Sequence, residues 1–356
     1  MNGRRDTRPS KPLRAAAMAA LLTGAVLAVI HNALPAFWGS PNVAMKWDAL
    51  HRAPRPARLL VGSSRIYRQV IPSLMDSVIG DGEHTFNAGF AATFPPATYQ
   101  LCERLLNGPG PLPAVVLVEL SNYMLYEEAN LADHRYWYYL GPREGVGLVR
   151  HALWLPGSSR GERLAYAARA ARATSYSLLG LGLVDHVMGS ASDADTLMAL
   201  GSSGDGALTL EEQVRRVPGD TGLATQRKAF LADTLAAGRR ATGIRRLYDR
   251  GPDTPVSPVH LGRLNALLDK ARQRGVRLCF VLPPLWLDRG EDLLALAHAL
   301  PDTAVIALCH PDTFPAFYRP DHMFDAGHLN DQGARLFTIA LARALRGEPT
   351  GQDLPH

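Results

Sequence analysis

Ala57-Arg-Leu-Leu-Val-Gly-Ser-Ser-Arg-Ile66 is the stretch that decides the fold. A short apolar run that stops in a Gly-Ser-Ser turn indicates a buried strand, and this one delivers Ser64 to the carboxyl end of the strand. Open α/β sheets bind their ligands at that end. Ser64 is therefore the first candidate for a functional side chain.

Strands and helices alternate along most of the chain that follows. The expected strands cover residues 58–62, 85–88, 114–119, 277–282 and 304–308. The expected helices cover residues 67–79, 96–106, 260–274, 291–300 and 331–345. Strands joined by single helical crossovers indicate a parallel, doubly wound sheet. We therefore expect an α/β domain.

The alternation is interrupted after the third strand, where helical periodicity predicts a large helical insertion. Within it, the Gly/Ser/Asp-rich residues 189–206 are typical of a mobile loop. A second Gly-Ser-Ser-Arg occurs at Gly157–Arg160, where we expect it to cap a helix and not to supply a nucleophile.

The predicted organisation has six parts. These are a basic tail and membrane anchor at 1–38, a polar linker at 39–56, the first part of the α/β domain at 57–122, the insertion at 123–257, the second part of the domain at 258–346 and a tail at 347–356.

The charge distribution bears on the partners of the protein. The 356-residue chain is 47% hydrophobic and 20% charged, with a net charge of +5. Five basic residues and one acid give residues 1–14 a charge of +4, which leaves +1 for the rest. A nucleic-acid-binding protein would carry its basic residues on the folded body, so we expect no nucleic-acid partner.

An apolar segment follows the basic N-terminus. Residues 15–30 are uncharged and almost wholly apolar, and Pro12 to Trp38 can supply the roughly 20 residues of a transmembrane helix. The basic flank predicts a single-pass protein of the inner (cytoplasmic) membrane with an extracytoplasmic body. A cleaved signal peptide is the alternative, but Pro35 in Ala33-Leu-Pro-Ala36 disfavours cleavage.

The cysteines and histidines do not predict a metal site or a cofactor. The three cysteines cannot all pair, and none has zinc-ligand spacing. Two of them, Cys279 and Cys309, fall in or beside apolar runs, so we expect these two to be buried. An alternative assigns metal ligation to a polar cluster near the C-terminus, but no histidine pair has the helical spacing of a metalloprotease. The cysteines are Cys102, Cys279 and Cys309, and the cluster is His310, Asp312, Asp321, His322, Asp325 and His328.

Residues able to perform nucleophilic catalysis fall at the ends of expected strands or beyond the last one. Asp325 stands three residues before His328, a spacing that lets the carboxylate hold one ring nitrogen while the other faces Ser64. Gly89 ends the second strand, where a glycine permits close backbone approach, and the Asn122 amide ends the third. Both are candidate donors for an oxyanion.

Ser64, Gly89, Asn122 and the pair Asp325 and His328 mark four blocks of sequence, called here the first, second, third and histidine blocks. Their order and spacing resemble those of the SGNH (GDSL-like) hydrolases and acyltransferases. The resemblance implies a flavodoxin-like three-layer α/β/α sandwich with a parallel sheet. It also implies Ser64 as nucleophile, His328 as general base and Asp325 as its orienter, with an oxyanion hole formed by the backbone N–H groups of Ser64 and Gly89 and the amide of Asn122.

Two features depart from the family pattern. Ser63 stands where the family has aspartate, and Leu120-Ser121-Asn122 lacks the usual glycine and aspartate. A chain that combines serine in place of this aspartate with a membrane anchor is similar to the extracytoplasmic branch of the family, which includes proteins of alginate O-acetylation and teichoic-acid D-alanylation. That likeness implies a membrane-bound acyltransferase as a partner.

Three further residues are candidates for substrate binding. Arg65 either contacts an anionic substrate or pairs with a structural carboxylate. Asn87 adjoins the second block, and Tyr123 begins an aromatic-rich segment that either stacks on sugar rings or packs the insertion against the core. The aromatic residues are Tyr123, Tyr126, Tyr136, Trp137, Tyr138 and Tyr139.

These observations predict a serine esterase or O-acyltransferase that acts on acyl esters of cell-envelope carbohydrate. Both reactions use the same residues, and we expect the insertion to roof the site and select between water and a carbohydrate acceptor. The alternative is a noncatalytic scaffold or polysaccharide-binding partner of an envelope assembly.

Overall fold

The computed structural model describes residues 11–33, 41–52, 55–122, 131, 137, 140–178, 193–217, 221–233, 235–251, 253–284 and 290–349. At its centre is a five-stranded, fully parallel sheet with the strand order β2-β1-β3-β4-β5. The strands are β1 (Arg58–Val61), β2 (Thr85–Asn87), β3 (Val115–Glu119), β4 (Arg277–Leu282) and β5 (Val305–Ala307). The predicted α/β class and parallel sheet are confirmed.

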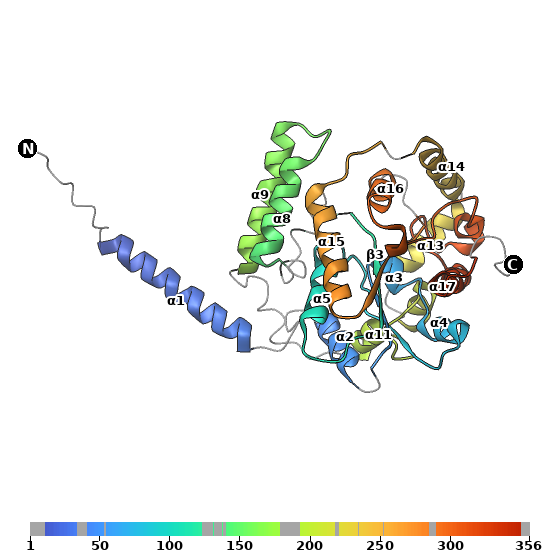
Figure 1. Cartoon of the computed structure of the whole chain (residues 1–356), viewed down its shortest axis with the longest axis horizontal. Coiled ribbons are helices and arrows are strands. Elements are labelled where there is room, and N and C mark those ends of the chain that lie inside the picture. The colour runs from blue at the N-terminus through green and yellow to red at the C-terminus, as the bar shows by residue number, and fades with distance from the viewer. Residues whose placement is uncertain are drawn as a thin grey trace, which may run out of the picture.

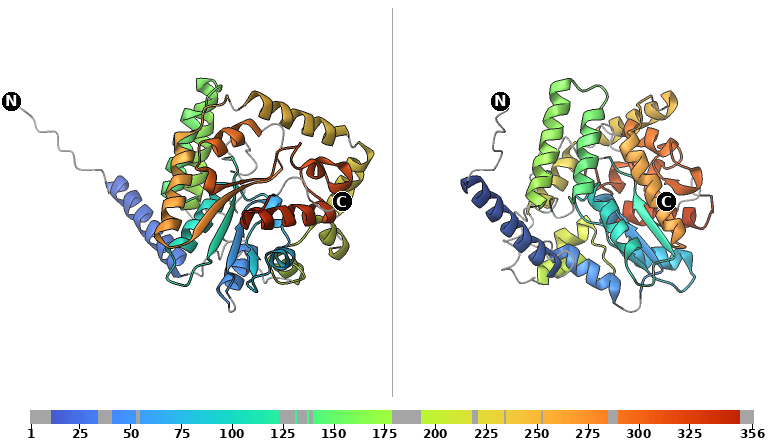
Figure 2. Two further views of the ribbon diagram at one scale, coloured as in Figure 1. Left: turned by 45° about the vertical axis from the view of Figure 1, so that its right-hand side comes forward. Right: turned by 60° about the vertical axis from the view of Figure 1, so that its left-hand side comes forward.

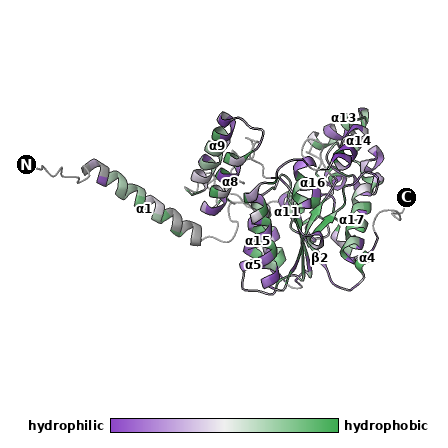
Figure 3. Cartoon of the chain, turned by 45° about the horizontal axis from the view of Figure 1, so that its top comes forward, coloured by the Kyte–Doolittle hydropathy of each residue, from purple (hydrophilic) through white to green (hydrophobic). Residues whose placement is uncertain are grey.

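Helices cover both faces of the sheet (Figure 3). Helices α5 (Ala97–Asn107) and α15 (Pro258–Gln273) lie on one face, and α4 (Pro72–Ile79) and α17 (Asp331–Leu345) pack together on the other. Because both faces are covered, β1, β3 and β4 are buried along almost their whole length, which explains their continuous apolar runs. The edge strand β5 is partly exposed.

The strand order reverses direction between β1 and β3. This 2-1-3-4-5 order is also that of flavodoxin, and ligands of such sheets bind outside the carboxyl ends of the strands at this switch point. The segment that follows β1 therefore occupies the favoured position for a site.

The helix predicted over residues 67–79 is instead two helices, α3 (Ser64–Tyr67) and α4. The cause is the Ile71-Pro72 dipeptide, because a residue before proline is disfavoured in the helical region. Ile71 has extended dihedral angles and precedes the first turn of α4.

The segment predicted as a polar linker contains helix α2 (Pro41–His51). Val43, Lys46 and Leu50 of α2 are buried against the body of the protein. These residues therefore belong to the folded body.

The described part of the insertion contains a helical hairpin and four further helices that lie around the sheet domain (Figure 1). Helices α8 (Pro142–Trp154) and α9 (Arg160–Leu178) form a hairpin with a small apolar core of its own (Figure 2). The four further helices are α11 (Asp193–Leu200), α12 (Leu210–Arg216), α13 (Thr221–Ala232) and α14 (Leu235–Arg250). Helix α11 packs against α2.

The prediction of a mobile loop over residues 189–206 is wrong for its described part. Residues 193–200 form α11, and the following turn is held against β2, because the Asn87 N–H donates to the carbonyl oxygen of Asp205 at 2.8 Å. Residues 189–192 lie outside the described part of the chain.

The N-terminal segment forms helix α1 (Lys11–Ala33), which lies apart from the sheet domain (Figure 1). None of the helices in the described ranges has both the length and the apolar character needed to cross a bilayer, so the predicted transmembrane helix is not supported.

Candidate functional site

Ser64 lies directly beyond β1, as the first residue of α3. Ser63 is the N-cap, and its hydroxyl accepts a hydrogen bond from the Arg65 N–H at 3.3 Å. Gly62 allows the tight turn, because a Cβ there would lie 2.5 Å from Ile66 and 2.7 Å from the side chain of Glu119. The turn therefore places Ser64 just beyond the carboxyl end of β1.

Ser64, His328 and Asp325 form a continuous chain of hydrogen bonds. Ser64 Oγ lies 2.8 Å from His328 Nε2, and His328 Nδ1 lies 3.0 Å from both carboxylate oxygens of Asp325. A carboxylate only accepts hydrogen bonds, so Nδ1 carries the hydrogen and Nε2 is free to accept the Ser64 O–H. The predicted relation among these three residues is present in the structure.

Burial along this chain decreases from the carboxylate to the serine. The Asp325 side chain is 5% exposed and that of His328 is 18% exposed, while Ser64 is half-buried. The Ser64 side chain is thus partly open to solvent while the Asp325 carboxylate is shielded, an arrangement compatible with an activated serine.

Asp325 is held by three donors besides the His328 ring. Its Oδ1 accepts the N–H groups of Gly327 at 2.6 Å and His328 at 2.8 Å, and its Oδ2 accepts the Gln226 side-chain amide at 2.9 Å. Burial on its own would raise the pKa of Asp325, but the hydrogen bond with the His328 ring and these backbone donors lower it. Asp325 is therefore kept as a carboxylate.

The insertion supports the loop that carries Asp325 and His328. From α13, the Arg227 guanidinium donates to the carbonyl oxygens of Met323 and Phe324. From α14, the buried Arg240 donates to the carbonyl oxygen of Ala326 at 2.8 Å. The insertion thus fixes the histidine loop, a role that the sequence analysis did not assign to it.

From the sequence there was no indication that the site depends on Gln226, Arg227 and Arg240. They lie about a hundred residues before the loop that they contact, and no spacing or motif links the two segments. The long insertion placed before the histidine block was the only available signal.

Arg65 pairs with a structural carboxylate, one of its two predicted roles. Its guanidinium donates to Glu119 Oε1 at 2.6 and 2.9 Å, while Glu119 Oε2 accepts the Ser63 N–H at 2.6 Å. Glu119 is fully buried and Arg65 nearly so. The predicted contact of Arg65 with substrate is therefore corrected to a buried ion pair beneath the Ser64 turn.

The Asn87 side chain also has a structural role in place of the predicted contact with substrate. Its amide donates to the carbonyl oxygens of Ile66 at 2.9 Å and Val70 at 3.1 Å, and its Oδ1 accepts the Gly89 N–H at 2.9 Å. The Gly89 N–H, a predicted oxyanion donor, therefore already has an acceptor. Gly89 still lies against α3, because a Cβ there would be 2.9 Å from the backbone nitrogen of Tyr67.

Lys46 of α2 also holds the segment from Asn87 to Gly89 in place. Its ammonium donates to the carbonyl oxygens of Asn87 at 2.9 Å, Gly89 at 2.6 Å and Gly206 at 2.6 Å. Burial lowers the pKa of Lys46 well below its ordinary value, and the nearby Arg68 lowers it further. One side chain of α2 thus connects the second block with the insertion.

Asn122 lies at the same edge of the sheet as Ser64. Val61 of β1 pairs with Val118 of β3, and Ser64 and Asn122 follow those paired residues by three and four positions. Asn122 is 8% exposed, and its Nδ2 has no hydrogen-bond partner among the residues that the structure describes. It is a buried donor without an acceptor.

Tyr123, Tyr126, Tyr136, Tyr138 and Tyr139 lie outside the described residues. Trp137, the described member of this aromatic group, donates from its indole to the carbonyl oxygen of Leu131 at 2.7 Å and lies edge-on to Tyr176. Its role is therefore packing within the insertion.

The polar cluster near the C-terminus is divided among separate partners. Asp312 binds Arg245, Asp321 binds Arg319, and Asp325 binds His328. Over the described ranges, the structure brings together no group of side chains suited to hold a metal ion. The three cysteines are buried free thiols, which confirms the prediction for Cys279 and Cys309.

Comparison with known proteins identifies no relative. No family model, no curated protein and no solved structure matches the chain.

Proposed function

We propose that this protein is a serine esterase or O-acyltransferase of the SGNH type that acts on acyl esters of cell-envelope carbohydrate. The observation that carries the proposal is the unbroken hydrogen-bond chain from Ser64 through His328 to Asp325. The half-buried position of Ser64 at the switch point of the sheet supports it.

In the proposed first half-reaction, Ser64 Oγ attacks the ester carbonyl carbon while His328 Nε2 takes the hydroxyl proton. Asp325 stabilises the imidazolium that forms. The carbon–oxygen bond to the leaving alcohol breaks, the alcohol takes the proton from His328, and the acyl group stays on Ser64.

In the second half-reaction, a water molecule or a carbohydrate hydroxyl attacks the acyl-enzyme. His328 accepts its proton and returns it to Ser64 Oγ. The products are a carboxylic acid when water attacks and a new ester when the hydroxyl attacks.

The developing negative charge on the carbonyl oxygen needs hydrogen-bond donors. The Ser64 N–H belongs to the first turn of α3, whose amides have no partner within the helix. The Nδ2 of Asn122 is a second donor at this edge. We omit Gly89 from the oxyanion hole, because its N–H already donates to Asn87.

The second candidate is a noncatalytic scaffold with the same fold. Two observations favour it: the engaged N–H of Gly89 and the serine at position 63 in place of an acid. The extracytoplasmic location and a membrane-bound acyltransferase partner also stay predictions.

A fluorophosphonate probe separates the two candidates, because it reacts only with an activated serine. We expect the full chain to be labelled, and we expect the label to be lost in Ser64→Ala and His328→Ala. Ser159→Ala is the matched control, since Ser159 occupies the same place in the second Gly-Ser-Ser-Arg. Labelling that survives Ser64→Ala contradicts the triad, and a wild-type chain that is not labelled favours the scaffold.

A further inference from the structure

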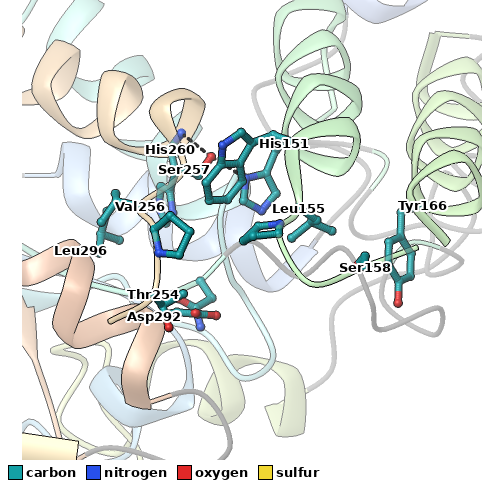
Figure 4. A pocket seen from close by; sticks show the side chains of 14 residues that line it. His151, Leu155, Ser158, Tyr166, Thr254, Val256, Ser257, His260, Asp292 and Leu296 are labelled. Atoms are coloured by element: carbon teal, nitrogen blue, oxygen red, sulfur yellow. Dashed lines mark hydrogen bonds between the residues drawn. The ribbon is translucent and has the colours of Figure 1, made fainter. Parts of the chain in front are cut away.

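A polar cavity of about 430 Å³ lies between the α8–α9 hairpin and the sheet domain (Figure 4). Its walls come from the end of α8, the start of α9, the segment that leads into α15, and α16 (Gly290–His298). Small-molecule sites have volumes of roughly 300–1,000 Å³. The cavity is therefore large enough for a ligand of the size of a sugar unit.

Asn122 connects this cavity with the candidate catalytic edge. It lines the cavity, it is more than nine-tenths buried, and its Nδ2 has no acceptor in the described part of the chain. Because a buried donor without an acceptor is unfavourable, the position points to a ligand with an oxygen acceptor. Such a ligand would extend from the cavity toward the edge that holds Ser64.

The cavity wall contains a network of polar groups that face one another. His151 Nδ1 lies 2.7 Å from Ser257 Oγ, which also accepts the backbone N–H of His260 at 3.3 Å (Figure 4). His260 Nε2 lies 2.7 Å from the hydroxyl of Tyr99. Burial lowers the pKa of His151 to about 4 and that of His260 to about 3, so both rings are neutral at ordinary pH.

The charge of the cavity selects against anions. Of the described residues that line it, none is lysine or arginine, and the acid is Asp292. A phosphate or a uronate carboxylate would enter without a cation to pair with, and Asp292 would repel it. An uncharged ligand meets no such penalty, and its hydroxyl groups can donate to a carboxylate.

Aromatic side chains complete the wall. Trp154, at the end of α8, and Tyr166, on α9, both line the cavity. Aromatic faces bury the apolar C–H surface of a ring while hydrogen-bonding groups contact its edge. Neutral polar groups combined with aromatic surface are suited to a polyhydroxylated ring.

We propose that this cavity binds a unit of an uncharged carbohydrate and presents it as the acyl acceptor to the edge of the sheet that carries Ser64. The acceptor role rests on the proposed function, whereas binding in the cavity does not. The cavity thus favours transfer to a neutral sugar over transfer to an anionic polymer.

Binding is tested on the full chain carrying Ser64→Ala, so that no turnover complicates the measurement. The probes are chitotetraose and cellotetraose, which are neutral, and tetragalacturonate, which is anionic. We expect calorimetric or saturation-transfer NMR binding of at least one neutral probe, at least about tenfold tighter than tetragalacturonate. Absence of binding by both neutral probes, or equal binding of the anion, overturns the proposal.

Variants at the wall locate the binding. We expect Trp154→Ala to weaken binding of the neutral probe about tenfold or more and Trp154→Phe to retain most of it, since one stacking surface remains. Leu153→Ala, at the exposed neighbouring position of α8, is the matched control and leaves binding unchanged. Unchanged binding in a folded Trp154→Ala contradicts this location.

The same set of proteins separates this inference from the proposed function. Fluorophosphonate labelling of the unmutated chain without sugar binding overturns the cavity proposal and leaves the serine chemistry in place. Sugar binding without labelling overturns the serine chemistry and leaves a carbohydrate-binding protein.

Discussion

The chain contains the tetrapeptide Gly-Ser-Ser-Arg twice, and the two copies adopt different roles. In Gly62–Arg65, the first serine caps α3, and the second serine points to His328. In Gly157–Arg160, the second serine is itself the cap. Its hydroxyl accepts the Glu162 N–H at 3.3 Å, and its own N–H donates to the Glu162 carboxylate at 2.8 Å.

The surroundings of the two copies explain this difference. The first copy follows a buried strand, and a fully buried carboxylate on the neighbouring strand binds both its arginine and its first serine. The second copy is exposed and precedes a long surface helix. The same four residues therefore place a serine against a histidine only where a second strand supplies Glu119 and a distant loop supplies His328.

The largest expected difference between the two copies is in turnover. We expect Ser64→Ala to lower the hydrolysis of p-nitrophenyl acetate by roughly a thousandfold or more, because the nucleophile is lost. Ser159→Ala removes only a helix cap and should leave the rate unchanged. Steady-state kinetics on the two purified variants measure the difference, and equal rates would contradict the assignment of Ser64.

The second difference is in the carboxylate that supports each copy. Glu119→Ala leaves the buried Arg65 without its carboxylate, and breaking such a pair costs about 3–5 kcal/mol. Glu162→Ala acts on an exposed side chain and should change the urea midpoint only slightly. If the two variants unfold at the same urea concentration, the ion pair is not what stabilises the Ser64 turn.

The third difference is in the effect of replacing the glycine of each copy, Gly62 or Gly157, by alanine. A Cβ at Gly62 would overlap Ile66 and Glu119, so Gly62→Ala should cost about 1–3 kcal/mol and also slow turnover by displacing Ser64. Gly157 has a φ of +73° in open space, so Gly157→Ala should cost roughly 1 kcal/mol and leave turnover intact. Thermal unfolding together with activity assays separates overlap from backbone strain.

The smallest difference concerns acid stability. The pKa of Asp325 is lower in the folded protein than in an unfolded chain, where it is about 3.9. Its stabilising effect is therefore fully present above that unfolded value and is lost as the pH falls through the lower folded value. We expect Asp325→Asn to flatten the fall in unfolding free energy between about pH 5 and pH 2.

Glu162 is the control for this measurement, because its pKa is also lowered, first by the Ser159 N–H. Its side chain is exposed, so Glu162→Gln should change the pH profile less than Asp325→Asn does. A larger change for Glu162→Gln would show that the buried carboxylate does not govern acid stability.

The sheet was predictable because β1, β3 and β4, which are buried on both faces, are continuous apolar runs. Each of the five strands was placed to within about one residue. The Ser64–His328–Asp325 relation was predictable because an aspartate three residues before a histidine in a turn has few geometries. Pro72 was visible in the sequence, and the break between α3 and α4 follows from it.

The supporting contacts were not predictable, because they join residues far apart in the chain. Glu119 was within an expected strand, but its pairing with Arg65 depends on the register of β1 and β3. Likewise, the sequence did not show that the Gly89 N–H donates to the Asn87 side chain. The position of that side chain depends on its hydrogen bond to α3, so the Gly89 N–H was assigned to an oxyanion instead.

The contacts of Lys46 show that the folded body begins before the first strand of the α/β pattern and includes α2. Its ammonium satisfies three carbonyl oxygens that belong to β2, the Gly89 loop and the insertion. A shortened protein that began at residue 55 would leave these oxygens without their donor and expose the surface under α2. Any fragment prepared for expression or crystallisation should therefore retain Pro41–His51 at its start.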